Sequence, residues 1–250
     1  MINSCLTIAA SDNCGGAGIQ QDIKVAHDFN YWAFSAVTGI TVQDFNKLYK
    51  FEAVKSNLLK LQIEHCLKNY SVKAVKIGAI CSEENIKVIA DCLSENKQQN
   101  VVLDPVLASS SGAEFLKTET LQILKEKLFP LTNLITPNKI EFEILCGQKV
   151  NSICDAIEIG KEKAKLWNTS ILLKGGHFYD KEIKEIIISD TNIYSFNRER
   201  KKFLYNHGTG CTLSTAIACN LASGNSLYYS YLLSSDYLTK LYVNLNELLL

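Results

Sequence analysis

The sequence has 250 residues, of which 47% are hydrophobic, and its 26 basic and 26 acidic side chains give a formal net charge of zero. This length and composition allow a sizeable core and fit one α/β domain spanning residues 1–250. The charge balance argues against a nucleic-acid-binding protein, and no apolar run reaches membrane-spanning length. The first ten residues lack the basic region of a signal peptide, so we expect a cytoplasmic protein.

Nine cysteines are present, but none forms a C-x-x-C pair. The odd number and the absent spacing favour neither a disulfide framework nor a zinc site. Most of these thiols, such as Cys66 and Cys92, are predicted to be small buried side chains.

Strand and helix patterns alternate along the chain. The predicted strands cover residues 5–10, 32–41, 72–77, 101–103, 134–136 and 171–173, and a hairpin covers 185–197. The predicted helices cover residues 19–29, 52–70, 83–93, 118–128 and 153–167. In the second of these helices Val54, Leu58 and Leu61 are expected to face the core, and His65 continues that stripe. The alternation predicts a mostly parallel sheet covered by helices on both faces.

Polar motifs follow the strands of this predicted sheet. They are Ser11-Asp12, Lys76-Ile77-Gly78, Asp104-Pro105, Thr136-Pro137-Asn138, Lys174-Gly175 and the turn at Gly208. Ligands of open α/β sheets bind beyond the carboxyl ends of the strands. These motifs are therefore expected to meet in one site.

The segment from His207 to Ser214 is the most informative stretch of the chain. Gly208 and Gly210 allow a tight turn with uncovered N–H groups, and Cys211 or Thr212 is expected to lie in the first turn of the helix that follows. The first turn of a helix attracts anions, phosphate above all, and it favours a thiolate. Cys211 is therefore a candidate base whose pKa should fall. The alternative is a buried helix start with a structural cysteine.

Asp104, Asn138 and Glu141 are candidate ligands for Mg²⁺. Asn138 and Glu141 stand three residues apart at a predicted helix start, so both can face one way. Together with Asp104 they supply the hard oxygen atoms that Mg²⁺ prefers, largely through waters. Alternatively, Asn138 caps the helix and Glu141 completes a capping box. Lys174 either neutralises phosphate charge or merely ends a strand.

Six segments in chain order resemble the motifs of hydroxymethylpyrimidine/phosphomethylpyrimidine kinases of thiamine synthesis. They are residues 9–24, Lys76-Ile-Gly78, Asp104-Pro-Val106, 134–138 with Glu141, Leu173-Lys-Gly-Gly-His177 and His207 to Ser214. The resemblance implies a ribokinase-like fold, which is a three-layer α/β/α arrangement with a mostly parallel central sheet. It also implies ATP and Mg²⁺ as co-substrates, a small pyrimidine substrate and a homodimer.

The resemblance also assigns roles to individual residues. It implies that Gln43 binds the pyrimidine, with Asp22 in the same pocket. It implies that Lys174 and Thr209 lie at the ATP phosphates, and that Asn138 and Glu141 serve the Mg²⁺–phosphate region. Residues 208–211, including Gly208, Thr209 and Gly210, would form the anion hole. Cys211 would take the proton from the substrate hydroxyl.

Three positions depart from the family pattern. Ala79 stands where a methionine is usual, Asn30 where glycine is frequent, and Asp44 where asparagine is usual. Two other functions remain open at this point. One is a pyridoxal kinase of the same cysteine-bearing group, and the other is a catalytically decayed kinase fold that acts as a binding module.

Overall fold

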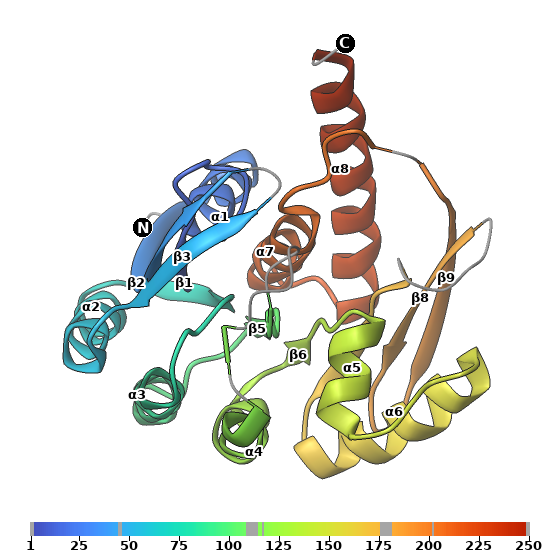
Figure 1. The fold of residues 1–250 in the computed structure, drawn as a ribbon, viewed down its shortest axis with the longest axis horizontal. Coiled ribbons are helices and arrows are strands. Elements are labelled where there is room, and N and C mark those ends of the chain that lie inside the picture. The colour runs from blue at the N-terminus through green and yellow to red at the C-terminus, as the bar shows by residue number, and fades with distance from the viewer. Residues whose placement is uncertain are drawn as a thin grey trace.

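A computed structural model of the chain describes residues 3–44, 47–108, 115–116, 118–175, 182–201 and 203–248. Its nine strands form one sheet in the order β3-β2-β1-β4-β5-β6-β7-β8-β9 (Figure 1). The strands are β1 (Ser4–Ser11), β2 (Trp32–Gln43), β3 (Leu48–Ala53), β4 (Val72–Ile77), β5 (Val101–Leu103), β6 (Leu134–Ile135), β7 (Ser170–Leu173), β8 (Glu182–Ile188) and β9 (Ile193–Glu199). Neighbouring strands from β2 to β7 run parallel, whereas β3, β8 and β9 pair antiparallel at the two edges. The predicted mostly parallel sheet is thus confirmed.

Helices cover both faces of this sheet. They are α1 (Gly18–Asp28), α2 (Ser56–Asn69), α3 (Glu83–Glu95), α4 (Leu121–Ile123), α5 (Lys139–Cys146), α6 (Ile153–Trp167), α7 (Thr209–Ala222) and α8 (Leu227–Leu248). Short irregular turns flank α4: 3-10 turns η1 (Thr118–Thr120) and η3 (Phe129–Leu131), and a π turn η2 (Leu124–Leu128). No helix among the described residues is long and apolar enough to cross a membrane.

Alternating residues of each strand point to opposite layers of helices. On β5, Val101 and Leu103 pack into the large core cluster with α2 to α6. Val102, between them, packs with Leu213 and Ile217 of α7 and with α8. This alternation produces the expected α/β/α sandwich.

The region before α2 corrects the sequence reading. Residues 48–53 form strand β3, so the predicted helix over 52–70 starts only at Ser56. The predicted buried stripe is also wrong, because Leu58 and Leu61 are 52% and 62% exposed and His65 is exposed. The face that contacts the core carries Leu59, Ile63 and Cys66 instead.

The conformation of Asn30 and the burial of two cysteines agree with what their residue types allow. Asn30 adopts a left-handed φ of 60° in the turn after α1, which explains how it replaces a glycine, since asparagine tolerates this conformation. All nine cysteines are free, and Cys66 and Cys92 are buried as predicted.

Candidate active site

The polar motifs meet at the carboxyl ends of the parallel strands, as expected. Asp12 follows β1, Gly78 follows β4 and Asp104 follows β5. The segment after β6 is joined to the end of β7 by a bridge between Asn138 and Lys174. Gly176 and His177, which complete one of the motifs, lie outside the described residues.

The turn at Gly208 packs directly on the glycine-rich loop that follows β1. Gly208 has a φ of 80°, and a Cβ there would lie 1.8 Å from the carbonyl oxygen of Gly16, so only glycine fits. The Asp12 carboxylate organises this loop by accepting hydrogen bonds from the backbone N–H groups of Gly16 and Ala17 and from His207. Burial alone would raise the pKa of Asp12, but these bonds hold it well below its usual range.

Helix α7 starts at this turn, and its first residues lie beside a charged pair. A Cβ on Gly210 would lie 3.3 Å from both Asp104 Oδ2 and Lys174 Nζ. Residues 207–211 are partly exposed, so a ligand has access to them. Donors at a helix start beside a lysine are the groups that an anion-binding site requires, and their role in binding an anion stays a prediction.

Cys211 occupies the predicted position, but its pKa moves in the opposite direction to the prediction. Burial raises the pKa of the thiol to about 11, and the carboxylates of Asp22 and Asp104 add to the shift. The Lys76 ammonium and the backbone N–H of Gly18 oppose this rise without overcoming it. The expectation of a lowered pKa considered the helix start alone, and neither the burial of the thiol nor these carboxylates.

Beneath the turn lies a buried polar cluster whose lysine was not assigned a role from sequence. The Lys76 Nζ lies 2.8 Å from both oxygens of Asp22, and the two side chains are 2% and 0% exposed. Thr7 and Thr215 also donate to the Asp22 carboxylate. A ligand therefore does not reach Asp22 in this arrangement, because its oxygens face protein donors. The sequence signal that could have indicated this cluster is a lysine placed near the end of the largely buried strand β4.

Asp104, Glu141 and Lys174 form a second charged cluster. Lys174 Nζ lies 2.8 Å from Asp104 Oδ1 and 3.9 Å from Glu141 Oε2. Thr136 also donates to Asp104. Burial raises the pKa of Glu141 to about 7; Lys174 opposes this rise, and the Asp104 carboxylate adds a smaller contribution to it. Conversely, burial would raise the pKa of Asp104, but Lys174 and Lys76 lower it.

Asn138 and Glu141 form the capping box that was the alternative to metal binding. The Asn138 side chain accepts from the Glu141 N–H, and Glu141 Oε2 accepts from the Asn138 N–H at 2.7 Å. No group of three or more His, Cys, Asp or Glu side chains among the described residues is arranged to hold a metal by itself. Asp104 and Glu141 nonetheless offer two carboxyl groups beside one another, which would suit a divalent cation held largely through waters once both are ionised.

Gln43 ends β2 beside the same loop. Its backbone is held by Asn13, which donates to the Gln43 carbonyl at 3.0 Å and accepts from the Gln43 N–H at 2.8 Å. Cys14 donates to the same carbonyl oxygen. A hydrogen bond from the Gln43 side chain helps to lower the pKa of Asp12. Gln43 therefore lies next to the loop and is partly exposed.

Comparison with known proteins decides the family. The family model for phosphomethylpyrimidine kinase matches residues 12–247. The chain belongs to the phosphomethylpyrimidine kinase family. The hydroxymethylpyrimidine/phosphomethylpyrimidine kinase of Aquifex aeolicus is 31% identical over 243 residues, which cover 97% of this chain and 95% of that protein.

Two solved structures extend the comparison. The phosphomethylpyrimidine kinase of Clostridium difficile has a TM-score of 0.84 and 34% identity, covering 95% of this chain and 98% of the other. The ADP complex of Bacillus subtilis pyridoxal kinase has a TM-score of 0.86 and 28% identity, covering 96% and 91%. This member of the phosphomethylpyrimidine kinase family therefore has the predicted ribokinase-like fold, and its fold is also shared with a pyridoxal kinase.

Proposed function

We propose that the protein transfers the terminal phosphate of ATP to 4-amino-5-hydroxymethyl-2-methylpyrimidine and to its monophosphate, in thiamine biosynthesis. The observation that carries this proposal is the helix start at Gly208 to Cys211, which faces the Lys174–Asp104 pair in a chain of this kinase family. Phosphoryl transfer requires positioning and charge stabilisation above all, and this site offers both.

Each side of the site then has a role in the transfer. The N–H groups of residues 209–211 would bind the phosphate oxygens as charge develops on them, and Lys174 would neutralise the ATP phosphates from the opposite side. Asp104 and Glu141, with Asn138 fixing the start of α5, would hold Mg²⁺, whose charge further neutralises the phosphates. The capping box and the Asp104–Lys174 contact already hold these two carboxylates and the lysine in place.

Cys211 would remove the proton from the substrate hydroxyl. Its raised pKa means that the thiolate is a minor species in the ligand-free protein at neutral pH. We infer that Lys76 supports this minor species from below, since its ammonium favours the thiolate. Asp22 would fix Lys76 in place, while its own carboxylate raises the pKa of Cys211.

Gln43 would recognise the pyrimidine. A side-chain amide offers a donor and an acceptor, and an aminopyrimidine presents the matching pair. Pyridoxal has a phenolic oxygen in place of the amino group and leaves a partner of the amide unpaired, at a cost of about 1–3 kcal/mol. The wild type should therefore prefer the pyrimidine by at least roughly tenfold in kcat/KM.

Pyridoxal kinase is the second candidate, because that structural neighbour is closely similar and Ala79 replaces a larger methionine. Ala79 packs beside Phe51, Phe115 and Val106 in a small apolar cluster at this end of the sheet. A smaller side chain there would leave room for a larger ring.

Coupled ADP release with the pyrimidine, its monophosphate and pyridoxal separates the two functions. Gln43→Leu should weaken turnover of the pyrimidine and leave pyridoxal turnover unchanged. Gln148→Leu, at an exposed position beyond α5, serves as the control and should change neither. Equal losses on both substrates, or a wild type that favours pyridoxal, would replace the thiamine assignment by the pyridoxal one. We also propose a cytoplasmic location, since nine free thiols suit a reducing compartment.

A further inference from the structure

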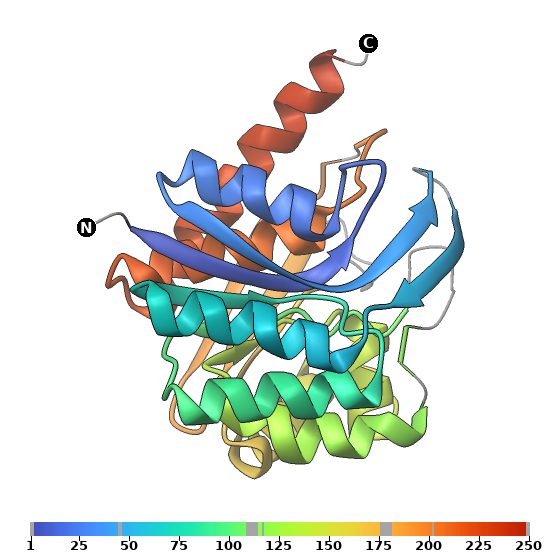
Figure 2. The same ribbon diagram turned by 90° about the vertical axis from the view of Figure 1, so that its left-hand side faces the viewer.

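The glycine-rich loop after β1 and the segment that leads into α7 meet with no spare room between them. The two lie side by side in Figure 2, the loop in dark blue and the segment in orange. A Cβ on Gly16 would collide with the Tyr205 hydroxyl and would lie 2.5 Å from His207 Cδ2. These steric contacts set the closest approach of the two segments. They attract only weakly, so they do not by themselves keep the segments from moving apart.

A hydrogen bond between Asp12 and His207 supplies the missing attraction. The His207 Nε2 lies 3.0 Å from Asp12 Oδ2, and the two side chains are 14% and 2% exposed. Because the Asp12 carboxylate is ionised and can only accept, His207 donates through Nε2 in this bond. A hydrogen bond to a charged group is about twice as strong as one between neutral groups. This bond therefore holds the loop and the segment together.

On the loop side the Asp12 carboxylate has little freedom to move. It also accepts hydrogen bonds from the backbone N–H groups of Cys14 at 2.8 Å, Gly16 at 3.1 Å and Ala17 at 2.8 Å. These three donors belong to the loop itself, so the carboxylate cannot follow His207 without distorting the loop. The position of the loop and the position of His207 are therefore linked.

On the other side His207 is connected to the last helix and to the phosphate-binding turn. The Tyr242 hydroxyl of α8 donates to the His207 carbonyl at 2.7 Å. Asn246, one turn further along α8, binds both the N–H and the carbonyl of Tyr205. Gly208, which directly follows His207, is the residue that begins α7. A shift of His207 therefore carries the first residues of α7 with it.

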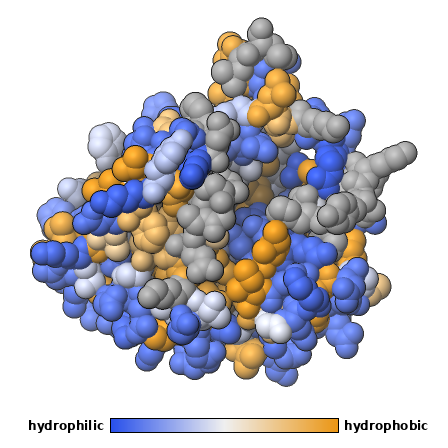
Figure 3. Space-filling view, viewed as in Figure 1, coloured by the Kyte–Doolittle hydropathy of each residue, from blue (hydrophilic) through white to orange (hydrophobic). Residues whose placement is uncertain are grey.

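The same loop determines where Gln43 lies. The end of β2 is poorly covered, since Ile40 is 59% and Val42 54% exposed, and apolar side chains gather over the β2–β3 region in the surface view (Figure 3). Besides its pairing with β3, the Gln43 backbone has two hydrogen bonds with Asn13 and one from Cys14. The loop therefore lies between the residue proposed to bind the pyrimidine and the turn proposed to bind phosphate.

We propose that His207 and Asp12 are positioning residues for phosphotransfer, which keep the pyrimidine hydroxyl and the phosphate-binding turn at reacting distance. The inference rests on the proposed function, because it requires that Gln43 and the start of α7 bind the two reactants. Reacting atoms have to approach to about 3–3.5 Å, and a displacement of about 1 Å can cost about 10²-fold in rate. Loss of the Asp12–His207 bond should therefore slow the transfer step more than it weakens the binding of either reactant.

Three substitutions of His207 separate this role from general support of the fold. The amide nitrogen of glutamine reaches the position of Nε2, that of asparagine reaches only the position of Nδ1, and leucine has no donor. In coupled ADP release, His207→Leu and His207→Asn should lower kcat by at least about tenfold, with KM for both reactants within about twofold of the wild type. His207→Gln should retain most of kcat. Equal kcat values for the glutamine and asparagine variants, or a wild-type kcat in His207→Leu, would overturn the proposal.

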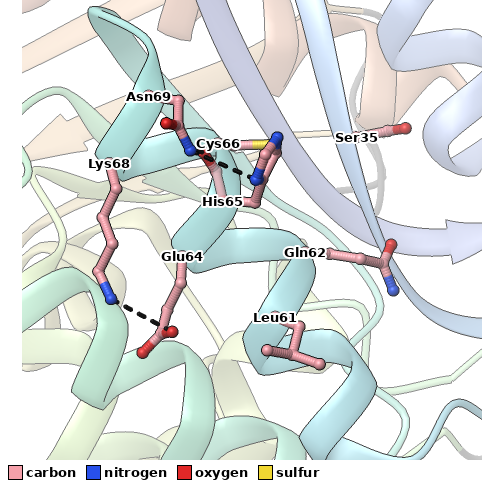
Figure 4. Close-up of a pocket in the computed structure, with 8 residues that line it drawn as sticks. All are labelled: Ser35, Leu61, Gln62, Glu64, His65, Cys66, Lys68 and Asn69. Atoms are coloured by element: carbon pink, nitrogen blue, oxygen red, sulfur yellow. Dashed lines mark hydrogen bonds and ion pairs between the residues drawn. The ribbon is translucent and has the colours of Figure 1, made fainter.

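Two variants away from the contact serve as matched controls. His65→Leu makes the same replacement in a groove of about 640 Å³, whose lining comes from β2 and α2 (Figure 4). Tyr31→Phe removes the 3.0 Å hydrogen bond to Ser223, which ties the chain after α1 to the opposite end of α7. Both should keep the wild-type kcat, although Tyr31→Phe should lower the midpoint of thermal unfolding. A loss of kcat in Tyr31→Phe as large as that in His207→Leu would show that His207 has no special positioning role.

Hydrogen–deuterium exchange tests the contact without any substrate. In His207→Leu and His207→Asn, peptides that contain residues 12–18 and 205–211 should both exchange at least about threefold faster than in the wild type, and His207→Gln should match the wild type. Unchanged exchange in His207→Leu, beside a wild type that is active, would refute this inference alone. A wild type that transfers phosphate to neither the pyrimidine nor pyridoxal would refute the proposed function and the inference with it.

Discussion

Replacing Glu141 by glutamine should stabilise the protein at neutral pH, and the advantage should grow as the pH rises. Glu141 lies buried beside Asp104, and Lys174 is shared between the two carboxylates, at 2.8 Å from Asp104 and 3.9 Å from Glu141. The pair therefore retains a proton in the folded state up to a pH of about 7, compared with the ordinary glutamate pKa of 4.5. Glutamine is neutral at every pH and can still accept the Asn138 N–H in the capping box.

The sign follows from the raised pKa. Between pH 4.5 and about 7 the folded protein holds a proton that the unfolded chain has lost. The stability contributed by protonated Glu141 is therefore fully present below pH 4.5 and is lost as the pH rises through about 7. A gap of about 2.5 pH units, at 1.36 kcal/mol per unit, corresponds to roughly 3 kcal/mol. The glutamine variant has no carboxyl group to titrate at this position, so its free energy of unfolding does not fall in this way as the pH rises.

Urea unfolding at pH 5, 6, 7 and 8 measures the difference between variant and wild type. It should be small at pH 5 and should approach roughly 3 kcal/mol in favour of the variant at pH 8. Glu143→Gln on the same helix is the control with the opposite sign, because a hydrogen bond from Lys149 lowers the pKa of Glu143. A difference that stays flat from pH 5 to 8 would show that Lys174 keeps Glu141 ionised throughout, and our reasoning would be wrong.

Three further substitutions test the anion site and its support. Cys211→Ala should lower kcat by about 10²-fold with little change in KM. The kcat/KM of the wild type should rise with pH, because the thiolate of Cys211 forms as the pH rises. Near-normal turnover of the variant would show that Cys211 is not the base. Lys76→Met should slow both phosphotransfer and alkylation of Cys211 by at least about tenfold, whereas Lys73→Met, exposed on the same strand, should match the wild type in both assays. Gly208→Ala should lower the free energy of unfolding by about 2 kcal/mol or more, because the alanine Cβ would clash with the Gly16 carbonyl oxygen. A variant with the same midpoint of thermal unfolding as the wild type would refute this.

The sheet and the location of the site were predictable because each motif directly follows an apolar strand. Asp104 after β5 and Lys174 after β7 lie at the same edge of the sheet when those strands run parallel, and their side chains meet across the end of β6. Strand β3 was missed because it begins Leu48-Tyr-Lys-Phe-Glu and runs into helical residues without a turn signal. The buried face of α2 was misassigned because both Leu58–Leu61 and Leu59–Ile63 have helical spacing.

The site chemistry was less predictable than its position. The pKa of Cys211 depends on Asp22 and Asp104, which stand 189 and 107 positions earlier in the chain, so local sequence carries no trace of their approach. Likewise, Asp22 looked available to a substrate until Lys76, Thr7 and Thr215 were seen to occupy its oxygens. Long-range burial, rather than motif, decides both properties.

Helix α8 was also missed, since apolar and polar residues are mixed around its circumference.

The contact between the glycine-rich loop and the turn at Gly208 has a consequence for synthesis of the chain. Asp12 and His207 meet at 3.0 Å although 195 positions separate them, and Tyr242 on the last helix donates to the His207 carbonyl. The glycine-rich loop is therefore synthesised long before the turn at Gly208 that it contacts. A nascent chain that ends before α8 lacks the tyrosine that holds this turn. The protein should consequently acquire its phosphate-binding capacity only after α8 has been synthesised, and a chain shortened before α8 should bind ATP more weakly than the full sequence.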